Sequence, residues 1–287
     1  MIKISIPVLI GVLLLSATVR AEQISYRATT SEKITQARLE RPEKTPSNVG
    51  APAVVLLHHG GGCVNSQTKK YADALNKAGY FTIEPCLFSS ASGQERSTVV
   101  FLPQVFGALK YLAQLQGVDK NRIAIAGGSY GAALTFVSAT SWAYGKHADH
   151  DLPPFAAHAP FYPGCYIYEK FIKARVGRAD LPADAYEKFT GSPVRIYAGG
   201  KDDYDSRDPK ACESMIQSLT PSNQQLVTLK FFPNATHGWD HLLNSSFYEP
   251  LACKGRGCNN SNVVDDATTQ EGIDDLIEFF RKSMPIK

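Results

Sequence analysis

The chain lacks a strong excess of charge of either sign. It has 30 lysines and arginines against 27 aspartates and glutamates, a formal charge of +3, and only 20% of its 287 residues are charged. So balanced a composition argues against the basic patches with which proteins hold nucleic acids or acidic membrane surfaces. We therefore expect no nucleic-acid partner and no charged macromolecular partner.

The chain also lacks an apolar run long enough to span a membrane. Its one extended apolar segment runs from Ile4 to Val19, directly after Lys3, whereas a spanning helix needs roughly 20 such residues. A basic start, a short apolar run and small residues before Glu22 are typical of a secretory signal peptide. We expect residues 1–21 to be that peptide, which makes the protein secreted or periplasmic with no stable membrane anchor. Its removal takes away two basic residues and no acidic one, and lowers the charge to +1.

Composition argues against two further classes, disordered proteins and domains in which disulfides replace a hydrophobic core. Hydrophobic residues make up 44% of the chain, which is too many for a disordered protein. The six cysteines are widely scattered in the sequence, so they would reinforce a hydrophobic core rather than replace one. The length suits one large domain that contains both helices and strands.

Segments of strand length alternate with segments of helical periodicity along the mature chain. Predicted strands cover 23–41 (as two strands), 53–58, 80–84, 122–126, 155–161, 194–198 and 226–232, and predicted helices cover 66–78, 105–114 and 129–139 and begin again near 208 and 268. This alternation predicts the α/β class, a mostly parallel sheet with helices on both faces. We expect a single domain over residues 22–287, with two less regular insertions at about 164–190 and 244–264.

A glycine-flanked serine follows one of the predicted strands. Gly127-Gly128-Ser129-Tyr130-Gly131 lies between the strand at 122–126 and a predicted helix. The G-x-S-x-G pattern in that context predicts a nucleophile elbow, a sharp turn that presents the serine hydroxyl at the carboxyl edge of the sheet. Such glycine-rich turns also occur by chance, and the flanking strand and helix favour the catalytic interpretation. Ser129 is therefore the predicted nucleophile.

A second glycine-rich segment follows the first buried strand. His59-Gly60-Gly61-Gly62 matches the loop that supplies backbone N–H donors to an oxyanion in serine hydrolases. A phosphate-binding loop would end in Gly-Lys-Ser/Thr, whereas Gly62 is followed by Cys63. A flexible glycine turn remains the alternative. We expect the amides of Gly61 and Tyr130 to form the oxyanion hole.

The acid of a hydrolase with this elbow comes after the serine in the chain. Asp202 follows the strand at 194–198 after a short glycine turn, and Asp203 and Asp205 are competitors in the same loop. Because Asp202 lies nearest the strand, its position is the most closely fixed, and we expect it to orient the catalytic imidazole.

The base should follow the acid, before the last helix. His237 satisfies that order, in a loop after the strand at 226–232, and His241 is the reserve. His58 and His59 flank the oxyanion loop and do not fit the order. His147 and His150 suggest a metal site only weakly, because no third ligand lies at a clear spacing, so we expect no metal.

These motifs together resemble the dienelactone hydrolase family of α/β hydrolases. The resemblance rests on HHGGGCVN at 58–65, AGGSYG at 126–131, FYPGC at 161–165, YAGGKDDYD at 197–205 and NATHGWD at 234–240. It implies the α/β-hydrolase fold, a triad of Ser129, Asp202 and His237, and no cofactor.

One departure from the family concerns the nucleophile. The enzymes that give the family its name carry cysteine in the elbow, and this chain has Ser129. A serine ester hydrolase acting on a small-molecule ester is therefore the favoured function. The GGSYG string also resembles the elbow of prolyl-oligopeptidase-type enzymes, so a secreted serine peptidase is the alternative. A non-catalytic binding protein on a hydrolase fold is the third, and it is disfavoured because all three triad residues are present.

Six cysteines allow fifteen pairings, and the expected sheet order narrows them. Cys165 and Cys212 follow neighbouring predicted strands, and Cys253 and Cys258 can close a small loop. Cys63 and Cys86 then remain as the third pair. The alternative is that some are free buried thiols.

Aromatic residues near the predicted site could line a pocket for the acyl group. The candidates are Tyr166, Tyr168 and Phe171, in the insertion at about 164–190, and Trp239, in the loop that contains His237. Aromatic residues in such loops also serve simply as packing, so the sequence leaves the size and type of the substrate open.

Overall fold

The computed structural model describes residues 21–42, 50–64, 66–90, 98–149, 151–174 and 181–285. The body of the expected signal peptide, residues 1–20, lies outside this part of the chain. His150 and part of the insertion expected at about 164–190 do so as well.

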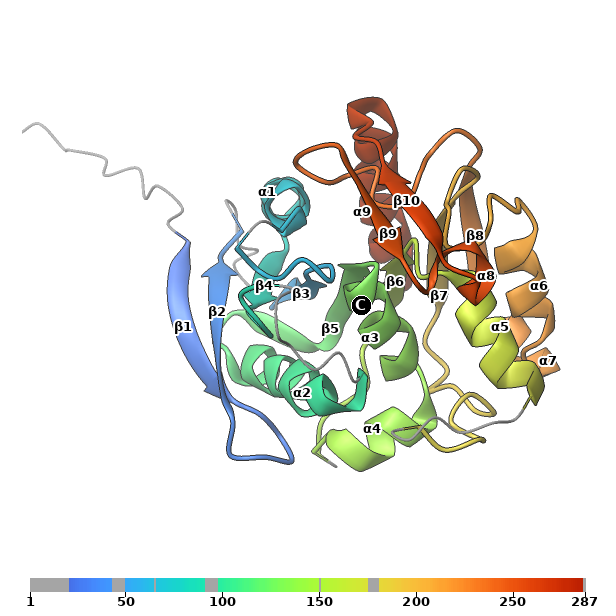
Figure 1. The fold of residues 1–287 in the computed structure, drawn as a ribbon. Coiled ribbons are helices and arrows are strands. Elements are labelled where there is room, and N and C mark those ends of the chain that lie inside the picture. The colour runs from blue at the N-terminus through green and yellow to red at the C-terminus, as the bar shows by residue number, and fades with distance from the viewer. Residues whose placement is uncertain are drawn as a thin grey trace, which may run out of the picture.

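Eight strands form one twisted sheet in the order β1-β2-β4-β3-β5-β6-β7-β8 (Figure 1). Their bounds are β1 Glu22–Arg27, β2 Ile34–Glu40, β3 Ala51–Leu57, β4 Phe81–Pro85, β5 Val118–Gly128, β6 His158–Phe161, β7 Val194–Gly199 and β8 Val227–Phe232. The β1–β2 and β2–β4 pairs are antiparallel, and the pairs from β4 across to β8 are parallel. The prediction of a mostly parallel α/β sheet is confirmed.

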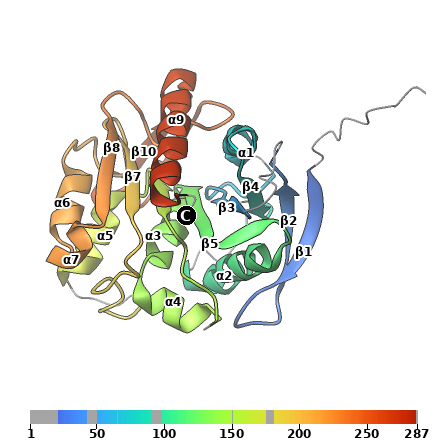
Figure 2. The ribbon, with the colours of Figure 1, turned by 180° about the vertical axis from the view of Figure 1, so that it is seen from behind.

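Helices cover both faces of this sheet. Their bounds are α1 Thr68–Lys77, α2 Thr98–Gln114, α3 Tyr130–Ser138, α4 Ser141–His147, α5 Cys165–Ala174, α6 Ala211–Gln217, α7 Pro221–Gln224, α8 Ala252–Gly255 and α9 Asp266–Ser283. Figures 1 and 2 show α1 and α9 on one side of the sheet and α2, α3 and α4 on the other.

The central strand β3 shows why two layers form. Successive side chains of a strand point to opposite faces, and β3 is buried almost throughout. Val55 and Leu57 pack in the cluster that includes α2 and α3. Val54 and Leu56 pack in a second cluster with α1 and α9. The continuous apolar run of β3 therefore supplies both cores.

Between β3 and β5 the order of the parallel strands reverses. Ligand sites of open α/β sheets lie beyond the carboxyl ends of the strands at such a switch point. The glycine loop after Leu57 and the elbow after Gly128 both begin there, on paired strands.

A two-stranded hairpin lies outside the main sheet. β9 (Ser245–Glu249) pairs antiparallel with β10 (Cys258–Asn262), and α8 lies between them. The sequence predicts only an irregular insertion here, so this element is a finding of the structure.

Three disulfides reinforce the loops. They join Cys63 to Cys86, Cys165 to Cys212 and Cys253 to Cys258. Among the described residues, no helix has both the length and the apolar character needed to cross a membrane.

Candidate active site

Ser129 stands at the turn from β5 into α3. Its φ is 52°. Residues other than glycine rarely adopt this backbone conformation, so the surrounding structure must maintain it. Ser129 N–H donates to Phe161 O at 2.9 Å. Glycine is required on either side of the turn, because a Cβ on Gly127 would lie 2.6 Å from the carbonyl carbon of Gly131.

The structure brings together the three side chains predicted to form the triad. His237 Nε2 lies 2.8 Å from Ser129 Oγ, and His237 Nδ1 lies 2.9 Å from Asp202 Oδ2. The side chains of His237 and Asp202 are 4% and 3% exposed. In the neutral imidazole, a proton on Nδ1 donated to Asp202 leaves Nε2 as an acceptor for the serine proton.

Two tyrosines hold the imidazole of His237 from different sides. The ring of Tyr204 lies over it with a centroid separation of 4.2 Å, and the ring of Tyr162 meets it edge-on at 4.9 Å. Both contacts restrict rotation of the imidazole away from Ser129.

The three acids of the loop after β7 have separate partners. Asp202 Oδ1 accepts from Tyr204 N–H at 2.8 Å, which orients the carboxylate toward His237. Asp203 accepts from Arg207 and from Ser261 N–H of the hairpin. Asp205 accepts from the N–H groups of Cys165 and Tyr166 at the start of α5. Burial, followed by the nearby charge of Asp202, raises the pKa of Asp205 to about 7.

The structure places both predicted oxyanion donors at the cavity that Ser129 lines, and the amide of Gly61 donates to an imidazole there. Gly61, Ser129 and Tyr130 line the same cavity, with Tyr130 the first residue of α3. Gly61 N–H donates to His59 Nδ1 at 2.8 Å. For this amide to receive an oxyanion, the His59 ring must first give up that hydrogen bond.

The remaining histidines near the site differ in role. His58 bridges two loops, because its Nδ1 lies 2.8 Å from His59 O and its Nε2 accepts from Leu87 N–H. Burial lowers its pKa to about 4, so it is a neutral structural residue. His241 packs against His59 with a centroid separation of 4.2 Å, and neither ring replaces His237 in contact with Ser129.

A buried network behind His237 has no counterpart in the sequence predictions. Asp240 accepts from Tyr71 Oη and from Tyr162 Oη, each at 2.6 Å, and it is fully buried. Burial raises the pKa of Asp240. Because Tyr162 also contacts His237, the network connects α1 to the candidate base. The spacing H-G-W-D at 237–240 contains Asp240, but nothing in the sequence identifies its two tyrosine partners.

Ser129 and His237 open into a cavity of about 600 Å³. Two of the four aromatic residues predicted to line it, Tyr168 and Phe171, do so. Trp239 is instead fully buried in the core. Tyr166 is not among the lining residues, and its hydroxyl donates to Leu251 O of the hairpin segment.

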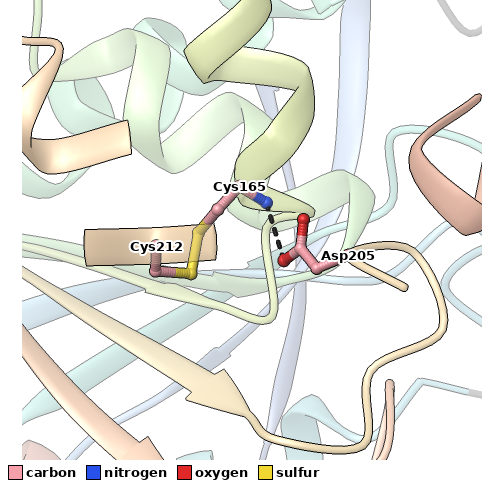
Figure 3. A group of neighbouring side chains, drawn as sticks. All are labelled: Cys165, Asp205 and Cys212. Atoms are coloured by element: carbon pink, nitrogen blue, oxygen red, sulfur yellow. Dashed lines mark hydrogen bonds between the residues drawn. A yellow bond between two sulfur atoms is a disulfide. The ribbon is translucent and has the colours of Figure 1, made fainter. Parts of the chain in front are cut away.

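One group of potential metal ligands occurs among the described residues, formed by Cys165, Asp205 and Cys212 (Figure 3). Both sulfurs are joined in a disulfide, whereas the thiolate is the form in which cysteine binds metals. Asp205 accepts a hydrogen bond from Cys165 N–H at 3.1 Å. Asp205 therefore serves as a cap for the start of α5, and the three residues together do not suit a metal ion.

Comparisons with known proteins agree with this architecture. The profile of the dienelactone hydrolase family matches residues 37–283. A putative dienelactone hydrolase from Klebsiella pneumoniae has a similar structure, with 16% identity, 90% of this chain and 98% of that chain covered, and a TM-score of 0.59. Esterase 2 of Thermogutta terrifontis, phosphonylated by cyclosarin, has 16% identity, coverage of 93% and 96%, and a TM-score of 0.65.

A peptidase also shares the fold. The acylaminoacyl peptidase of Pyrococcus horikoshii is 14% identical, with 94% of this chain and 43% of that chain covered, and a TM-score of 0.62. A search of the curated proteins finds no match to this sequence. At these identities the structural likeness establishes the α/β-hydrolase fold.

Proposed function

We propose that this chain, which belongs to the dienelactone hydrolase family, is a serine hydrolase that cleaves carboxylic esters through an acyl-enzyme. The observation that carries the proposal is the continuous hydrogen-bonded chain from Ser129 through His237 to Asp202. A hydrolase of the dienelactone hydrolase and esterase type is what the family and the fold support, and the nucleophile, ester specificity and intermediate are our inference.

The geometry supports a two-step acyl transfer. His237 Nε2 takes the proton of Ser129 Oγ as that oxygen attacks the ester carbonyl, and Asp202 stabilises the imidazolium that forms. The amides of Gly61 and Tyr130 would stabilise the tetrahedral oxyanion, with each donor contributing ~3–4 kcal/mol. His237 then protonates the leaving alcohol, and water activated by the same imidazole hydrolyses the acyl-enzyme. The residues named require no cofactor.

Replacement of the nucleophile tests this assignment. Ser129→Ala should remove ester turnover and labelling by a fluorophosphonate probe, and its circular dichroism spectrum should match that of the wild type. Asp73→Asn, which alters an exposed ion pair on α1, should keep full activity. Retained turnover or labelling in Ser129→Ala would refute the proposal.

The same assays separate the two alternatives. A peptidase would cleave peptide amides at rates comparable with esters, and the likeness to acylaminoacyl peptidase motivates that comparison. A binding protein would fail to react with the fluorophosphonate in its wild-type form.

We also propose that the protein is exported and that residues 22–287 form a single domain. The three disulfides support export, because such bonds persist in oxidising compartments. The sequence of residues 1–21 is the second support, and a mature protein that begins at Glu22 is the expected result of N-terminal sequencing.

A further inference from the structure

The cavity at Ser129 is lined mainly by apolar and aromatic side chains. Two groups of them come from separate parts of the chain. Ile167, Tyr168 and Phe171 of α5 form one group, which we call the α5 wall, and Phe247, Tyr248 and Leu251 form the second, which we call the hairpin wall.

Charge is scarce in this cavity. Among the described residues, its lining contains no lysine or arginine, and Glu249 is the one carboxylate. A substrate that carries a carboxylate would therefore find no lysine or arginine partner among these residues and would meet Glu249, and burial of an unpaired charge is costly.

The hairpin wall follows from the register of β9 and β10. Side chains two residues apart share a face of a strand, and Ser245, Phe247 and Glu249 line the cavity from β9. Asn262, opposite Ser245 in the register, lines it from β10. The face of the hairpin that carries these residues is therefore turned to the site, and Tyr248, which alternates to the other face of β9, also lines the cavity.

The loop that carries the catalytic acid holds this wall in place. Cys253 N–H donates to Asp203 O at 2.7 Å, and Ser261 N–H donates to Asp203 Oδ2 at 2.9 Å. Lys254 N–H donates to Tyr204 O at 2.9 Å. The hairpin is thus fixed to the residues next to Asp202, which sets the distance between the hairpin wall and the reacting atoms.

The α5 wall is fixed to the same loop. Asp205 accepts the first N–H groups of α5, and Cys165 is joined to Cys212. The short loop from Asp202 to Asp205 therefore positions the catalytic acid and both walls of the cavity.

From this arrangement we propose that the enzyme acts on uncharged esters with a bulky apolar or aromatic group, held between the α5 wall and the hairpin wall. The inference rests on the proposed ester hydrolysis and adds the substrate class. A cavity of about 600 Å³ is far larger than an acetyl or ethyl group requires and falls in the range of drug-sized ligands. Phe247 and Leu251 are the specificity-determining residues of the hairpin wall.

A matched series of esters tests the substrate class in the wild-type enzyme. Ethyl acetate, ethyl hexanoate, ethyl benzoate, hexyl acetate and benzyl acetate vary the apolar group on either side of the ester, and monoethyl adipate replaces the terminal methyl group of ethyl hexanoate with a carboxylate at the end of the acyl chain. We expect kcat/KM at least tenfold higher for the best bulky ester than for ethyl acetate, and at least tenfold lower for monoethyl adipate than for ethyl hexanoate.

Variants assign the effect to the hairpin. Phe247→Ala and Leu251→Ala should each reduce the preference for bulky esters by roughly tenfold, mainly through KM, with a much smaller effect on ethyl acetate. Leu243→Ala is the matched control, because Leu243 is 79% exposed and does not line the cavity. Glu249→Gln should improve turnover of monoethyl adipate relative to ethyl hexanoate.

The outcomes distinguish the proposed substrate class from the proposed ester hydrolysis on which it rests. Equal turnover of ethyl acetate and the bulky esters, or a preference for monoethyl adipate, overturns the substrate class and leaves ester hydrolysis intact. An unchanged preference in both Phe247→Ala and Leu251→Ala removes the hairpin wall from the proposal. An enzyme that hydrolyses none of these esters overturns the proposed function, and the substrate class with it.

Discussion

At the scale of single residues, Tyr162 has two roles that can be separated. Its hydroxyl donates to Asp240, and its ring meets the imidazole of His237 edge-on. Tyr71 makes an equivalent hydrogen bond to the other oxygen of Asp240, and its ring packs against Phe161 instead of the imidazole. Tyr162 Oη also accepts from Gln67 Nε2 at 3.2 Å, so the two tyrosines match in their bond to Asp240 and differ in this further contact.

We predict that Tyr162→Phe destabilises the protein at least as much as Tyr71→Phe, because it also removes the acceptor of Gln67 Nε2, and that the two variants affect catalysis differently. Each removes one donor from a buried carboxylate, at a cost of about 1–3 kcal/mol in the free energy of unfolding. Only Tyr162→Phe should lower kcat, by roughly tenfold, because it loosens the ring that positions His237. Urea denaturation and ester kinetics measure the two effects. Equal kcat in the two variants would show that Tyr162 has a structural role alone.

The sequence predicts the residues of the site where a local pattern constrains them. The elbow glycines and the chain order single out Ser129 and His237, which the structure brings within hydrogen-bonding distance. The partners of Asp240 come from α1 and from the end of β6, and no local pattern relates such distant segments. Trp239 was expected near the pocket, yet it lies in the core because only the three-dimensional path of its loop determines which way it faces.

At the scale of elements, the disulfide of the α5 wall and the disulfide of the hairpin enclose very different lengths of chain. Cys253 and Cys258 are 5 residues apart, and Cys165 and Cys212 are 47 apart. The entropy that a crosslink removes from the unfolded chain increases with loop length, which gives about 2 kcal/mol for the short loop and about 4 kcal/mol for the long one.

We predict that removing the long-loop disulfide mainly lowers stability and that removing the short-loop disulfide mainly affects substrate binding. Cys165→Ser with Cys212→Ser should lower the free energy of unfolding by about 2 kcal/mol more than Cys253→Ser with Cys258→Ser. The latter pair should raise KM for bulky esters, since it frees the turn of the hairpin wall, with a smaller change for ethyl acetate. Denaturant unfolding and kinetics on both esters check this, and a larger stability loss from the short loop would contradict it.

The sequence predicts the regular elements well and the insertions poorly. The apolar run predicted at 53–58 lies close to the observed bounds of β3, whereas β5 begins at Val118, before the strand predicted at 122–126. The final helix begins at Asp266 with Asp265 as its cap, slightly before the start expected near residue 268. The hairpin strands SSFYE and CNNSN are mostly polar, with SSFYE largely exposed and two asparagines of CNNSN buried. They depend on bonds to Asp203 that no local pattern reveals.

At the scale of the whole molecule, buried ionisable groups determine how stability depends on pH. Burial is the main cause that lowers the pKa of four histidines: His58, His147 and His241 to about 4, and His158 to about 3. Burial also raises the pKa of three acids: Glu84, Asp240 and Asp205, the last to about 7. The two groups act in opposite directions on acidification.

We predict a net loss of stability as the pH falls from about 6.5 to about 4. In that window the unfolded chain protonates its histidines while the folded protein keeps the four neutral, so each lowers the free energy of unfolding by up to ~1.4 kcal/mol per pH unit. The three acids oppose this loss, because on acidification they bind protons at a higher pH in the folded protein than in the unfolded chain. Asp205 offsets about one histidine across this window, and three acids do not cancel four histidines even where Glu84 and Asp240 are also protonated, so a net slope of at least about one group, or ~1.4 kcal/mol per pH unit, remains. Urea denaturation across this range measures the slope, and His147→Gln, remote from Ser129 on α4, should reduce it. A stability that is flat or that rises toward acid would show that the acids outweigh the histidines.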